Sequence, residues 1–547
     1  MAGGRSAMTD RPDVLVVGAG PAGLTTALQA CAHGASVRIV ERRREPFRPS
    51  RAMIVHPRTL ESLRPLGVVE RLLQRGDPSP SARLHLGRRV VSTTLADVAL
   101  RDTAFPHLTL LRQADVEQVL AEALEERGVP VERGVAAVEL AQDRAEATVT
   151  LRRDDGGAEP VSCGAVAGCD GQDSTVRRAT GIDWRGRAYR EEVVLADLDL
   201  DSDLAPGVLH VAAGRAGLVF LFALGEGAPW RLLATRPSRG GDAPFGQPGQ
   251  PVPRPELREL LDVAGFDVAV GRVAWSARVR LQHRLAAAFR LGRVFLVGDA
   301  AHTHSPAAAQ GMNTGILDAV NLGWKLPFAA HADEPDTMLD SYERERRPVA
   351  RQVLALTHLV FFAEAAGHPA PAFLRGTVAP LLAPVVPSLT RPTLLAPVVR
   401  LLSQGWVRYR GSALSSERWG GGPGPRAGDR LPDETVTCDG MRTRLHRLTA
   451  RPGVHVLLAR DAEEVGASVV EDCPVSVHRL ASRPGRRMVA VRPDGHVGFR
   501  GTAVADLTAW LRLVGARARS ADTATQLEDT ATQAADTATG AADTAES

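Results

Sequence analysis

A glycine-rich segment near the N-terminus has the residue types and spacing to hold a phosphate group. Residues 13–17 read as a strand, Gly18, Gly20 and Gly23 form a GxGxxG pattern with Pro21 and Ala22, and helix-forming residues occupy 24–32. Such glycines let the backbone approach a pyrophosphate, which lies at a helix N-terminus where the N–H groups and the helix dipole favour negative charge. The motif alone could be a structural turn, but the strand before it and the helix after it favour dinucleotide binding.

An acidic residue supports the same site. A second strand over 36–40 ends at Glu41, followed by Arg42. A carboxylate at this point accepts hydrogen bonds from ribose hydroxyl groups and repels a 2′-phosphate. The segment therefore predicts a site for FAD or NAD, and says nothing about which nicotinamide nucleotide would act as reductant.

A second constellation lies in the middle of the chain. Gly298-Asp299 follows an apolar run over 293–297, and Pro306 and Gln310-Gly-Met-Asn313 precede or open a long helix expected over 311–326. An acid at the carboxyl end of a parallel strand faces the ligand crevice, and the positive end of such a helix suits an anionic reduced flavin. His302 and His304 have no third ligand at suitable spacing, so we predict no metal site.

Other elements surround these motifs. Residues 112–127 read as an amphipathic helix, 161–169 as a strand followed at once by Asp170-Gly171, and 193–280 as short alternating runs that indicate a β-rich unit. Asp-Gly is also a common turn. The apolar strand expected over 217–224 is core by default, and lining a substrate pocket is an equally good interpretation.

Composition excludes several classes of protein. A net charge of +3, from 66 basic and 63 acidic residues, leaves no electrostatic footprint for nucleic acid. The five cysteines form no CxxC pair, which argues against disulfides and zinc and for a reducing compartment. The N-terminus lacks the apolar core of a signal peptide. Residues 378–402 contain five prolines and predict short packed helices, because a membrane span needs about 20 uninterrupted apolar residues. We expect a cytoplasmic protein with no membrane partner.

The order of the three motifs resembles the class A flavoprotein monooxygenases of the para-hydroxybenzoate hydroxylase type. The resemblance implies that Gly18 to Gly23 hold the ADP part of FAD, that Asp170-Gly171 lie near the pyrophosphate and the nicotinamide route, and that Gly298-Asp299 hold the ribityl chain. Arg51-Ala52 resembles the family's arginine segment that contacts FAD, although Arg51 could also be a surface arginine. The cofactor residues predicted in this way are Gly18, Gly20, Pro21, Ala22, Gly23, Glu41, Arg42, Arg51, Gln113, Asp170, Gly171, Gly298, Asp299, Pro306, Gln310, Gly311, Met312 and Asn313.

This chain departs from the family pattern in two places, a C-terminal segment without a cysteine pair and a loop with alanines in place of glycines. Residues 427–433 and 492–496 resemble the thioredoxin-like domain of the phenol hydroxylase and aromatic polyketide hydroxylase branch, but Cys438 and Cys473 stand alone, so we expect a structural and not a redox role. Ala308-Ala309 stands where the family often has two glycines. Alanine should be tolerated there unless φ is positive.

The predicted fold is α/β. It has a Rossmann-type FAD-binding domain with a β-rich substrate domain inserted and a C-terminal thioredoxin-like α/β domain. The predicted boundaries are an N-terminal tail at 1–11, the first part of the FAD-binding domain at 12–185 with an excursion to the substrate domain near 78–110, the substrate domain at 186–285, the closing FAD-binding part and helices at 286–415, the thioredoxin-like domain at 425–515 and a disordered tail at 516–547.

The functional hypothesis is an NAD(P)H- and O₂-dependent flavin monooxygenase that acts through an FAD C4a-hydroperoxide. A single GxGxxG implies that NADPH or NADH binds transiently, and no residue is assigned as a catalytic base because the cofactor carries the chemistry. The apolar β-rich unit suits a large polycyclic aromatic substrate of polyketide type, with Val219, Leu221 and Pro306 predicted in its pocket. The alternatives are Baeyer–Villiger oxygenation, an O₂-independent flavin reductase, and a non-enzymatic flavin- or antibiotic-binding protein. The chain is expected to be a monomer or a homodimer.

Overall fold

The structure is a computed structural model that describes residues 11–46, 50, 52–87, 89–214, 217–238, 245–365, 369–465 and 475–516. Arg51 and Cys473 lie outside the described residues, and so do residues 1–10 of the N-terminal tail predicted at 1–11 and residues 517–547 of the tail predicted at 516–547.

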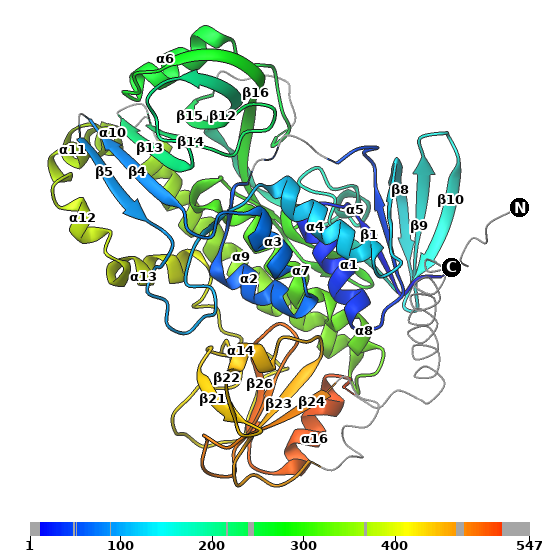
Figure 1. The fold of residues 1–547 in the computed structure, drawn as a ribbon. Coiled ribbons are helices and arrows are strands. Elements are labelled where there is room, and N and C mark those ends of the chain that lie inside the picture. Colours follow the sequence, from blue (N-terminus) through cyan, green and yellow to red (C-terminus); the bar gives the residue numbers. More distant parts are fainter. Residues whose placement is uncertain are drawn as a thin grey trace, which may run out of the picture.

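A mostly parallel sheet, called here the central sheet, forms the middle of the molecule (Figure 1). Its inner strands, Val14–Val17, Ala165–Gly168 and Val294–Leu296, are continuous buried runs because both faces are covered by other layers, as is usual for parallel strands. In spatial order they are β17 (Arg290–Leu291), β18 (Val294–Leu296), β11 (Ala165–Gly168), β1 (Val14–Val17), β2 (Val37–Glu41) and β7 (Val131–Arg133). β1 is parallel to both β2 and β11, so the loops after these strands leave the sheet at the same edge.

Helices cover the central sheet and supply the termini that point at this edge. α1 (Pro21–Ala32) lies between α4 (Gln113–Glu125) and α7 (Gln310–Gly323). The remaining elements of this part are β3 (Ile54–Val55), α2 (Pro57–Leu63), η1 (Arg64–Leu66), α3 (Val69–Arg75), β6 (Thr109–Leu110), α5 (Thr175–Ala179), η2 (Gly298–Ala300), η3 (Ala307–Ala309) and α8 (Lys325–Ala329).

The strand predicted over 161–169 is two strands. β10 (Ala158–Cys163) pairs with β9 (Ala147–Arg153), which pairs with β8 (Val135–Gln142), in a separate antiparallel sheet at the side of the molecule (Figure 1). Gly164 separates β10 from β11, and a Cβ atom there would lie 2.8 Å from the carbonyl oxygen of Asp13. The chain therefore changes sheets at a close backbone approach that an apolar run does not reveal.

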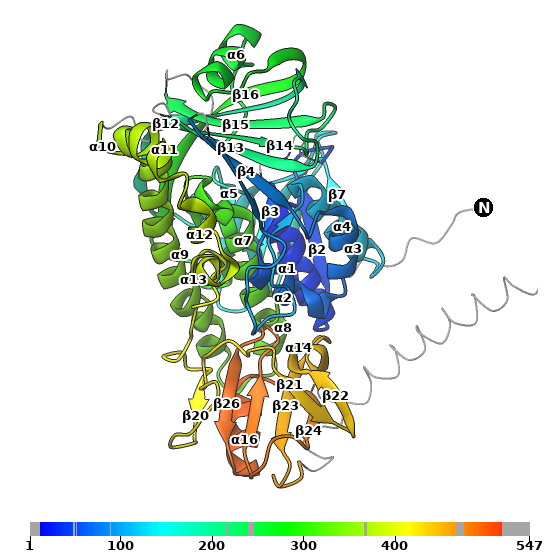
Figure 2. The ribbon, with the colours of Figure 1, turned by 60° about the vertical axis from the view of Figure 1, so that its left-hand side comes forward.

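A second large sheet, called here the roof sheet, lies above the central sheet (Figures 1 and 2). In spatial order its strands are β19 (His302–Thr303), β16 (Ala269–Ala286), β12 (Trp184–Asp201), β15 (Trp230–Pro237), β14 (Gly217–Phe222), β13 (Val208–Gly214), β4 (Ser81–Leu86) and β5 (Arg89–Thr94). α6 (Arg254–Val263) packs Leu257 and Leu261 into the core on one face of this sheet. The other face is turned toward the central sheet (Figure 2).

Helices close the molecule on one side. The long α9 (Pro335–Ala365) runs from the C-terminal unit up to the roof sheet (Figure 2), and α10 (Pro369–Phe373), the π-helix η4 (Leu374–Val378), α11 (Ala379–Leu382), α12 (Val386–Leu389) and α13 (Pro392–Leu402) follow it. Short helices were expected here, but Leu381 is 73% exposed and several of its apolar neighbours are exposed too, so close packing holds only in part. Within the described ranges no single helix has both the length and the apolarity to cross a membrane, although Pro335–Glu364 and Pro369–Leu382 meet that criterion as a bent pair.

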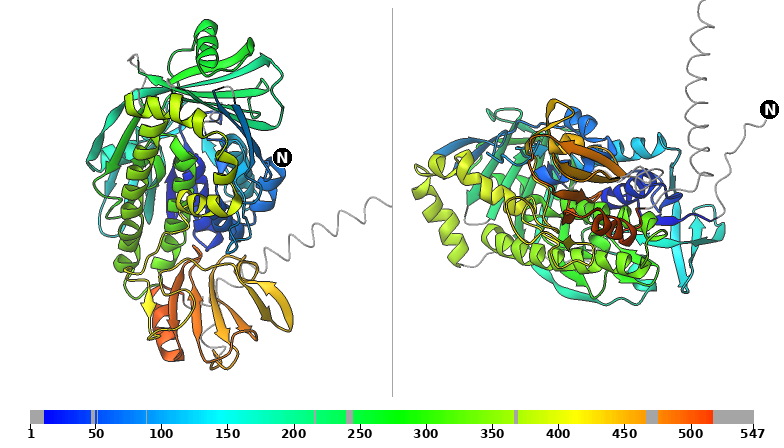
Figure 3. Two further views of the ribbon diagram at one scale, coloured as in Figure 1. Left: turned by 90° about the vertical axis from the view of Figure 1, so that its left-hand side faces the viewer. Right: turned by 90° about the horizontal axis from the view of Figure 1, so that it is seen from below.

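The C-terminal unit packs beneath the central sheet (Figure 3). Its sheet has the spatial order β20 (Ser416–Glu417), β26 (Val497–Gly501), β25 (Met488–Val491), β23 (Val454–Ala459), β24 (Val475–Leu480), β21 (Thr435–Cys438) and β22 (Met441–Arg444), with α14 (Leu445–Leu448) and α16 (Val504–Leu513) beside it. β23 is parallel to β24 and antiparallel to β25. The assignment of this unit as thioredoxin-like stays a prediction.

Buried charges join the C-terminal unit to the rest of the chain. Glu345 of α9 accepts hydrogen bonds from Lys325, the only lysine in the sequence, at 2.8 Å and from Arg492 at 2.7 Å. Their side chains are at most 2% exposed. Burial alone would raise the pKa of Glu345, but the two cations more than offset that effect and lower it. Burial lowers the pKa of Lys325 to about 8, despite the opposing effect of Glu345.

We predict that Glu345→Ala destabilises the fold by about 3–5 kcal/mol, because it leaves the Lys325 ammonium buried without its ion-pair partner and leaves Arg492 paired with Asp494 alone. The measurement is the free energy of unfolding in urea. The control is Asp183→Ala, which removes an ion pair with Arg185 whose two side chains are 70% and 67% exposed, and which should cost at most about 1 kcal/mol. Equal losses in the two variants would contradict the interpretation.

Candidate cofactor and active site

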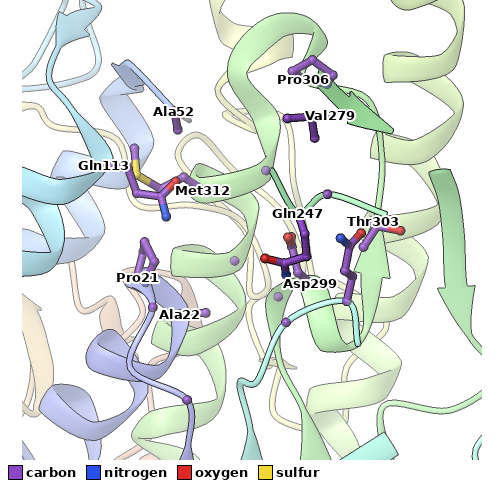
Figure 4. Close-up of a pocket in the computed structure, with 18 of the residues that line it drawn as sticks. Pro21, Ala22, Ala52, Gln113, Gln247, Val279, Asp299, Thr303, Pro306 and Met312 are labelled. Atoms are coloured by element: carbon purple, nitrogen blue, oxygen red, sulfur yellow. The ribbon is translucent and has the colours of Figure 1, made fainter. Parts of the chain in front are cut away.

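A cavity of about 780 Å³ lies between the carboxyl edge of the central sheet and the roof sheet. Loops from widely separated parts of the sequence form its floor, namely those after β1, β2, β11 and β18. Figure 4 shows Pro21, Ala22, Gln113 and Met312 on one side, and Gln247, Asp299 and Thr303 across from them. This volume lies in the upper part of the range of about 300–1,000 Å³ that is typical of ligand sites.

The glycine loop after β1 is shaped by close backbone contacts. Gly18 has φ +102°, and a Cβ atom on it would lie 2.5 Å from the carbonyl oxygen of Cys169. A Cβ on Gly23 would overlap the carbonyl oxygen of Gly18. Around Gly20, by contrast, a Cβ would meet nothing within 4 Å, because this residue borders the cavity. Gly20 caps α1 without a side-chain hydrogen bond, which leaves the helix N-terminus open to an anion.

Glu41 both shapes this loop and lines the cavity. Its carboxylate accepts hydrogen bonds from the backbone N–H groups of Ala19 and Arg43, each at 3.0 Å. Each carboxylate oxygen keeps further acceptor capacity. Ribose hydroxyl groups could therefore bind here without displacing the contacts of the loop.

Asp170 stabilises the turn before α5 with one carboxylate oxygen and leaves the other without a hydrogen-bond partner. Its Oδ2 accepts hydrogen bonds from the N–H groups of Thr175 at 2.6 Å and Val176 at 3.2 Å, at the start of α5. Its Oδ1 is buried and has no hydrogen-bond partner among the residues that the structure describes. Burial raises the pKa of this carboxyl group. A buried unpaired acceptor at a cavity wall indicates a missing polar ligand.

The loop after β18 brings α1 and α7 together. Gly298 has φ +59°, and a Cβ on it would lie 3.1 Å from the Cβ of Ala22 and 3.4 Å from the Cα of Gly315. The side chain of the next residue, Asp299, is exposed and borders the cavity (Figure 4).

The alanines that replace the family's glycines are strained. Ala308 has φ 56° and Ala309 has φ 53°, both in the left-handed region. Alanine was expected to be tolerated here only if φ was not positive, and φ is positive at both positions. The left-handed conformation costs about 1–2 kcal/mol of conformational energy per residue. Neighbouring contacts hold the loop in place: Ala307 packs on Phe361, and the Gln310 side chain donates a hydrogen bond to the carbonyl oxygen of Leu402.

Most of the predicted cofactor residues in the described ranges line this one cavity. They are Gly18, Gly20, Pro21, Ala22, Glu41, Arg42, Gln113, Asp170, Gly171, Gly298, Asp299, Pro306, Gly311 and Met312. Gly23, Gln310 and Asn313 do not line it. Asn313 instead accepts a hydrogen bond from the N–H group of His56 at 2.9 Å and donates one to the carbonyl oxygen of Ile54 at 2.9 Å, which fastens α7 to β3.

The pocket residues predicted on β14 lie on its other face. Val219 and Leu221 are buried in the core against α6, whereas Leu218, Phe220 and Phe222 line the cavity. Alternate residues of a strand point to opposite faces. Because the run is apolar on both faces, its periodicity did not show which set faces the cavity. Pro306, the third residue predicted for the substrate pocket, lines the cavity.

Several lining residues were not predicted from the sequence. They include Gln247, Thr303, His304, Phe361 and Glu364. His304 follows β19, and burial together with the neighbouring His302 lowers its pKa to about 4, so its imidazole is neutral at pH 7. His302 instead bonds Asp318 at 2.6 Å. Within the described part of the chain, no cluster of side chains could hold a metal ion.

Comparisons with known proteins agree with this geometry. Residues 11–357 match the family model described as FAD binding domain. The 6-methylpretetramide 4-monooxygenase of Streptomyces rimosus is 36% identical over 69% of this chain, and the match spans 65% of that enzyme, slightly less than two thirds of its length. An uncharacterized aromatic compound monooxygenase of Bacillus subtilis is 32% identical over 89% of this chain and 94% of its own. The solved anhydrotetracycline hydroxylase OxyS of Streptomyces rimosus superposes with a TM-score of 0.74 at 29% identity, over 93% of this chain and 100% of its own.

The chain belongs to the FAD binding domain family. It is an FAD-dependent monooxygenase, an oxidoreductase. The residues around the cavity fit FAD, because the open N-terminus of α1, the spare acceptor capacity of Glu41 and the unpaired oxygen of Asp170 are all unused by the protein itself.

We predict that Asp299→Ala yields protein with little or no flavin, because it removes the carboxylate that borders the proposed ribityl site. The measurement is the ratio of flavin absorbance to protein absorbance after purification. The control is Asp262→Ala on α6, whose side chain is 55% exposed, which should leave this ratio unchanged. A normal flavin content in Asp299→Ala would remove this carboxylate from the site.

We also predict that Ala308→Gly and Ala309→Gly each raise the free energy of unfolding by about 0.5–1 kcal/mol, because glycine relieves the left-handed strain while losing more conformational entropy on folding. Urea unfolding of the two variants measures the change. The control is Ala332→Gly in the loop between α8 and α9, because Ala332 is not among the residues with a positive φ. A loss of stability at 308 and 309 similar to that of the control would show that the loop is not strained.

Proposed function

We propose that this monooxygenase uses NAD(P)H and O₂ to hydroxylate a large polycyclic aromatic substrate of polyketide type. The observation that carries the proposal is the single cavity that joins the nucleotide loops to an apolar wall of the roof sheet. A flavin bound across the floor would present its ring to a substrate bound under the roof.

The residues suggest an orientation for FAD. The ADP part would lie at Gly20 and Glu41, with its pyrophosphate at the N-terminus of α1. The ribityl chain would run past Asp299, and the ring would lie beside Pro306 and Met312 at the start of α7. The positive end of α7 would stabilise negative charge on the reduced ring. When bound, FAD supplies the electron transfer and oxygen activation, and the protein supplies binding, orientation and exclusion of water.

The roof sheet provides an apolar chamber. Phe220 and Phe222 of β14, Leu233 of β15, Leu195 of β12 and Val279 of β16 line it. A dry wall of this kind protects a reactive oxygenating species from water. Aromatic and branched side chains also suit a flat, multi-ring substrate more than a small charged acid.

The names of related enzymes support a substrate of this class. Two relatives from Streptomyces rimosus are named 6-methylpretetramide 4-monooxygenase and 12-dehydrotetracycline 5-monooxygenase/anhydrotetracycline 6-monooxygenase. Pentachlorophenol 4-monooxygenase of Sphingobium chlorophenolicum, 30% identical over 84% of this chain, is named for a substituted phenol. These names support aromatic oxygenation as the proposed reaction, and the size of the cavity supports a polycyclic substrate.

We predict that the purified yellow protein oxidises NADPH faster when a polycyclic phenol is added, and that it consumes O₂ as it does so. Mass spectrometry of the product should show one added oxygen atom in a phenolic hydroxyl group. A product lactone would indicate Baeyer–Villiger oxygenation instead. Unchanged turnover without O₂ would exclude monooxygenation of the added substrate, and the absence of any stimulation across a panel of polycyclic phenols and quinones would exclude this substrate class.

A further inference from the structure

The apolar half of the cavity contains a carboxylic acid that the flavin site does not use. Glu364 in the last turn of α9 lines the cavity with Phe361, which lies one turn earlier on the same helix. The neighbouring wall is formed by Leu218 and Phe220 of β14. The Glu364 side chain forms no hydrogen bond or ion pair within the part of the chain that the structure describes. Glu364 is half-buried, and a carboxyl group partly removed from water without a partner is costly unless a ligand supplies one.

A second unpartnered group lies at the same end. Thr235 of β15 is 5% exposed and lines the cavity, and its hydroxyl oxygen has no hydrogen-bond partner in the described residues. Gly217 lies between the two residues. A Cβ on Gly217 would lie 2.7 Å from Thr235 Oγ1 and 3.6 Å from the backbone carbonyl oxygen of Glu364. Both residues line the same cavity, so two unused polar side chains from different elements border one apolar chamber.

The elements packed around Glu364 do not neutralise it. Arg375 of η4 donates hydrogen bonds to the carbonyl oxygens of Ala363, at 2.5 Å, and of Gly214, at 3.1 Å. Arg280 is another cation at the cavity wall, and its guanidinium lies 4.4 Å from the ring centroid of Phe245. Other titratable groups on the neighbouring elements are His304 at the cavity wall and the cluster of Tyr189 on β12, His283 on β16 and His358 on α9, beside Phe361. Burial raises the pKa of Glu364 to about 7.

We propose that Glu364 and Thr235 bind a phenolic hydroxyl group of the substrate and that Glu364 accepts its proton. The inference rests on the proposed function, because it assigns the end of the substrate that faces away from the flavin loops. The substrate O–H bond breaks, an O–H bond forms on the Glu364 carboxylate, and the electron pair stays on the phenolate oxygen. Thr235 donates a hydrogen bond to that oxygen. The added electron density makes the aromatic ring a better acceptor of an electrophilic oxygen atom.

The test compares two probes that differ only in the hydroxyl group, 9-phenanthrol and 9-methoxyphenanthrene. Their dissociation constants are measured with the holoenzyme from the change in flavin absorbance. We expect wild-type protein to bind 9-phenanthrol about tenfold more tightly than the ether, because a hydrogen bond to a charged group contributes about that factor. Glu364→Gln and Thr235→Val should each lose most of this preference, while their affinity for the ether stays within about twofold of wild type.

The matched control is Glu259→Gln, the same change at an exposed position on α6. It should keep the full preference for 9-phenanthrol. The flavin content of all variants should equal that of wild type, which shows that they fold and hold the cofactor.

The pH dependence provides a readout that packing alone would not change. Because the pKa of free Glu364 is raised to about 7, the carboxylate that accepts the proton is present above pH 7 and is lost as the pH falls. We therefore expect 9-phenanthrol to bind more tightly as the pH rises from 6 to 8 in wild type, and to bind equally across that range in Glu364→Gln.

The outcomes separate this inference from the proposed function. If Glu364→Gln keeps the preference for 9-phenanthrol and its pH dependence while NADPH oxidation is still stimulated, Glu364 is not the anchor and the monooxygenase proposal stands. If wild type does not distinguish the two probes, the anchor is likewise excluded. If neither probe binds and no polycyclic phenol stimulates NADPH oxidation in wild type, both proposals fail.

Discussion

Close contact between three backbone segments is the constraint on which the whole site depends. A Cβ on Gly18 would meet the carbonyl oxygen of Cys169. A Cβ on Gly298 or on Gly315 would lie within 3.5 Å of the Cβ of Ala22. The loops after β1, β11 and β18 can therefore meet only because these positions have no side chain. Their meeting leaves the N-terminus of α1 open at the carboxyl edge of a parallel sheet, where such sheets bind ligands.

The rest of the fold supplies the second wall of the cavity, the roof sheet, and holds it in place over the central sheet. β12 and β16 are long paired strands that extend from the central part of the molecule into the roof sheet. α9 connects the two ends: Glu345 is held by Lys325 and Arg492 near the C-terminal unit, and Glu364 borders the chamber about five turns later. The C-terminal unit thus contributes to the site through the helix that it anchors, and none of its described residues lines the cavity.

The sequence predicted the floor of the site better than its roof. Glycines, prolines and acids at strand ends have few structural alternatives, so Gly20, Glu41 and Asp299 could be placed together from their spacing. An apolar strand such as β14 has no polar residues to distinguish its faces, and the wrong face was therefore chosen. Glu364 lies far from every motif and reaches the cavity only because of the path of α9. The positive φ angles of Ala308 and Ala309 depend on contacts of the loop that no local pattern encodes.

We propose that FAD lies along the carboxyl edge of the central sheet, between its glycine loops and the roof sheet. The most direct test is a crystal structure of the protein purified with its flavin. We expect one FAD per chain, with its pyrophosphate at the N-terminus of α1 and its ring between Pro306 and Phe220. A nucleotide bound at any other place, or a chain that takes up no FAD when the cofactor is supplied, would contradict it.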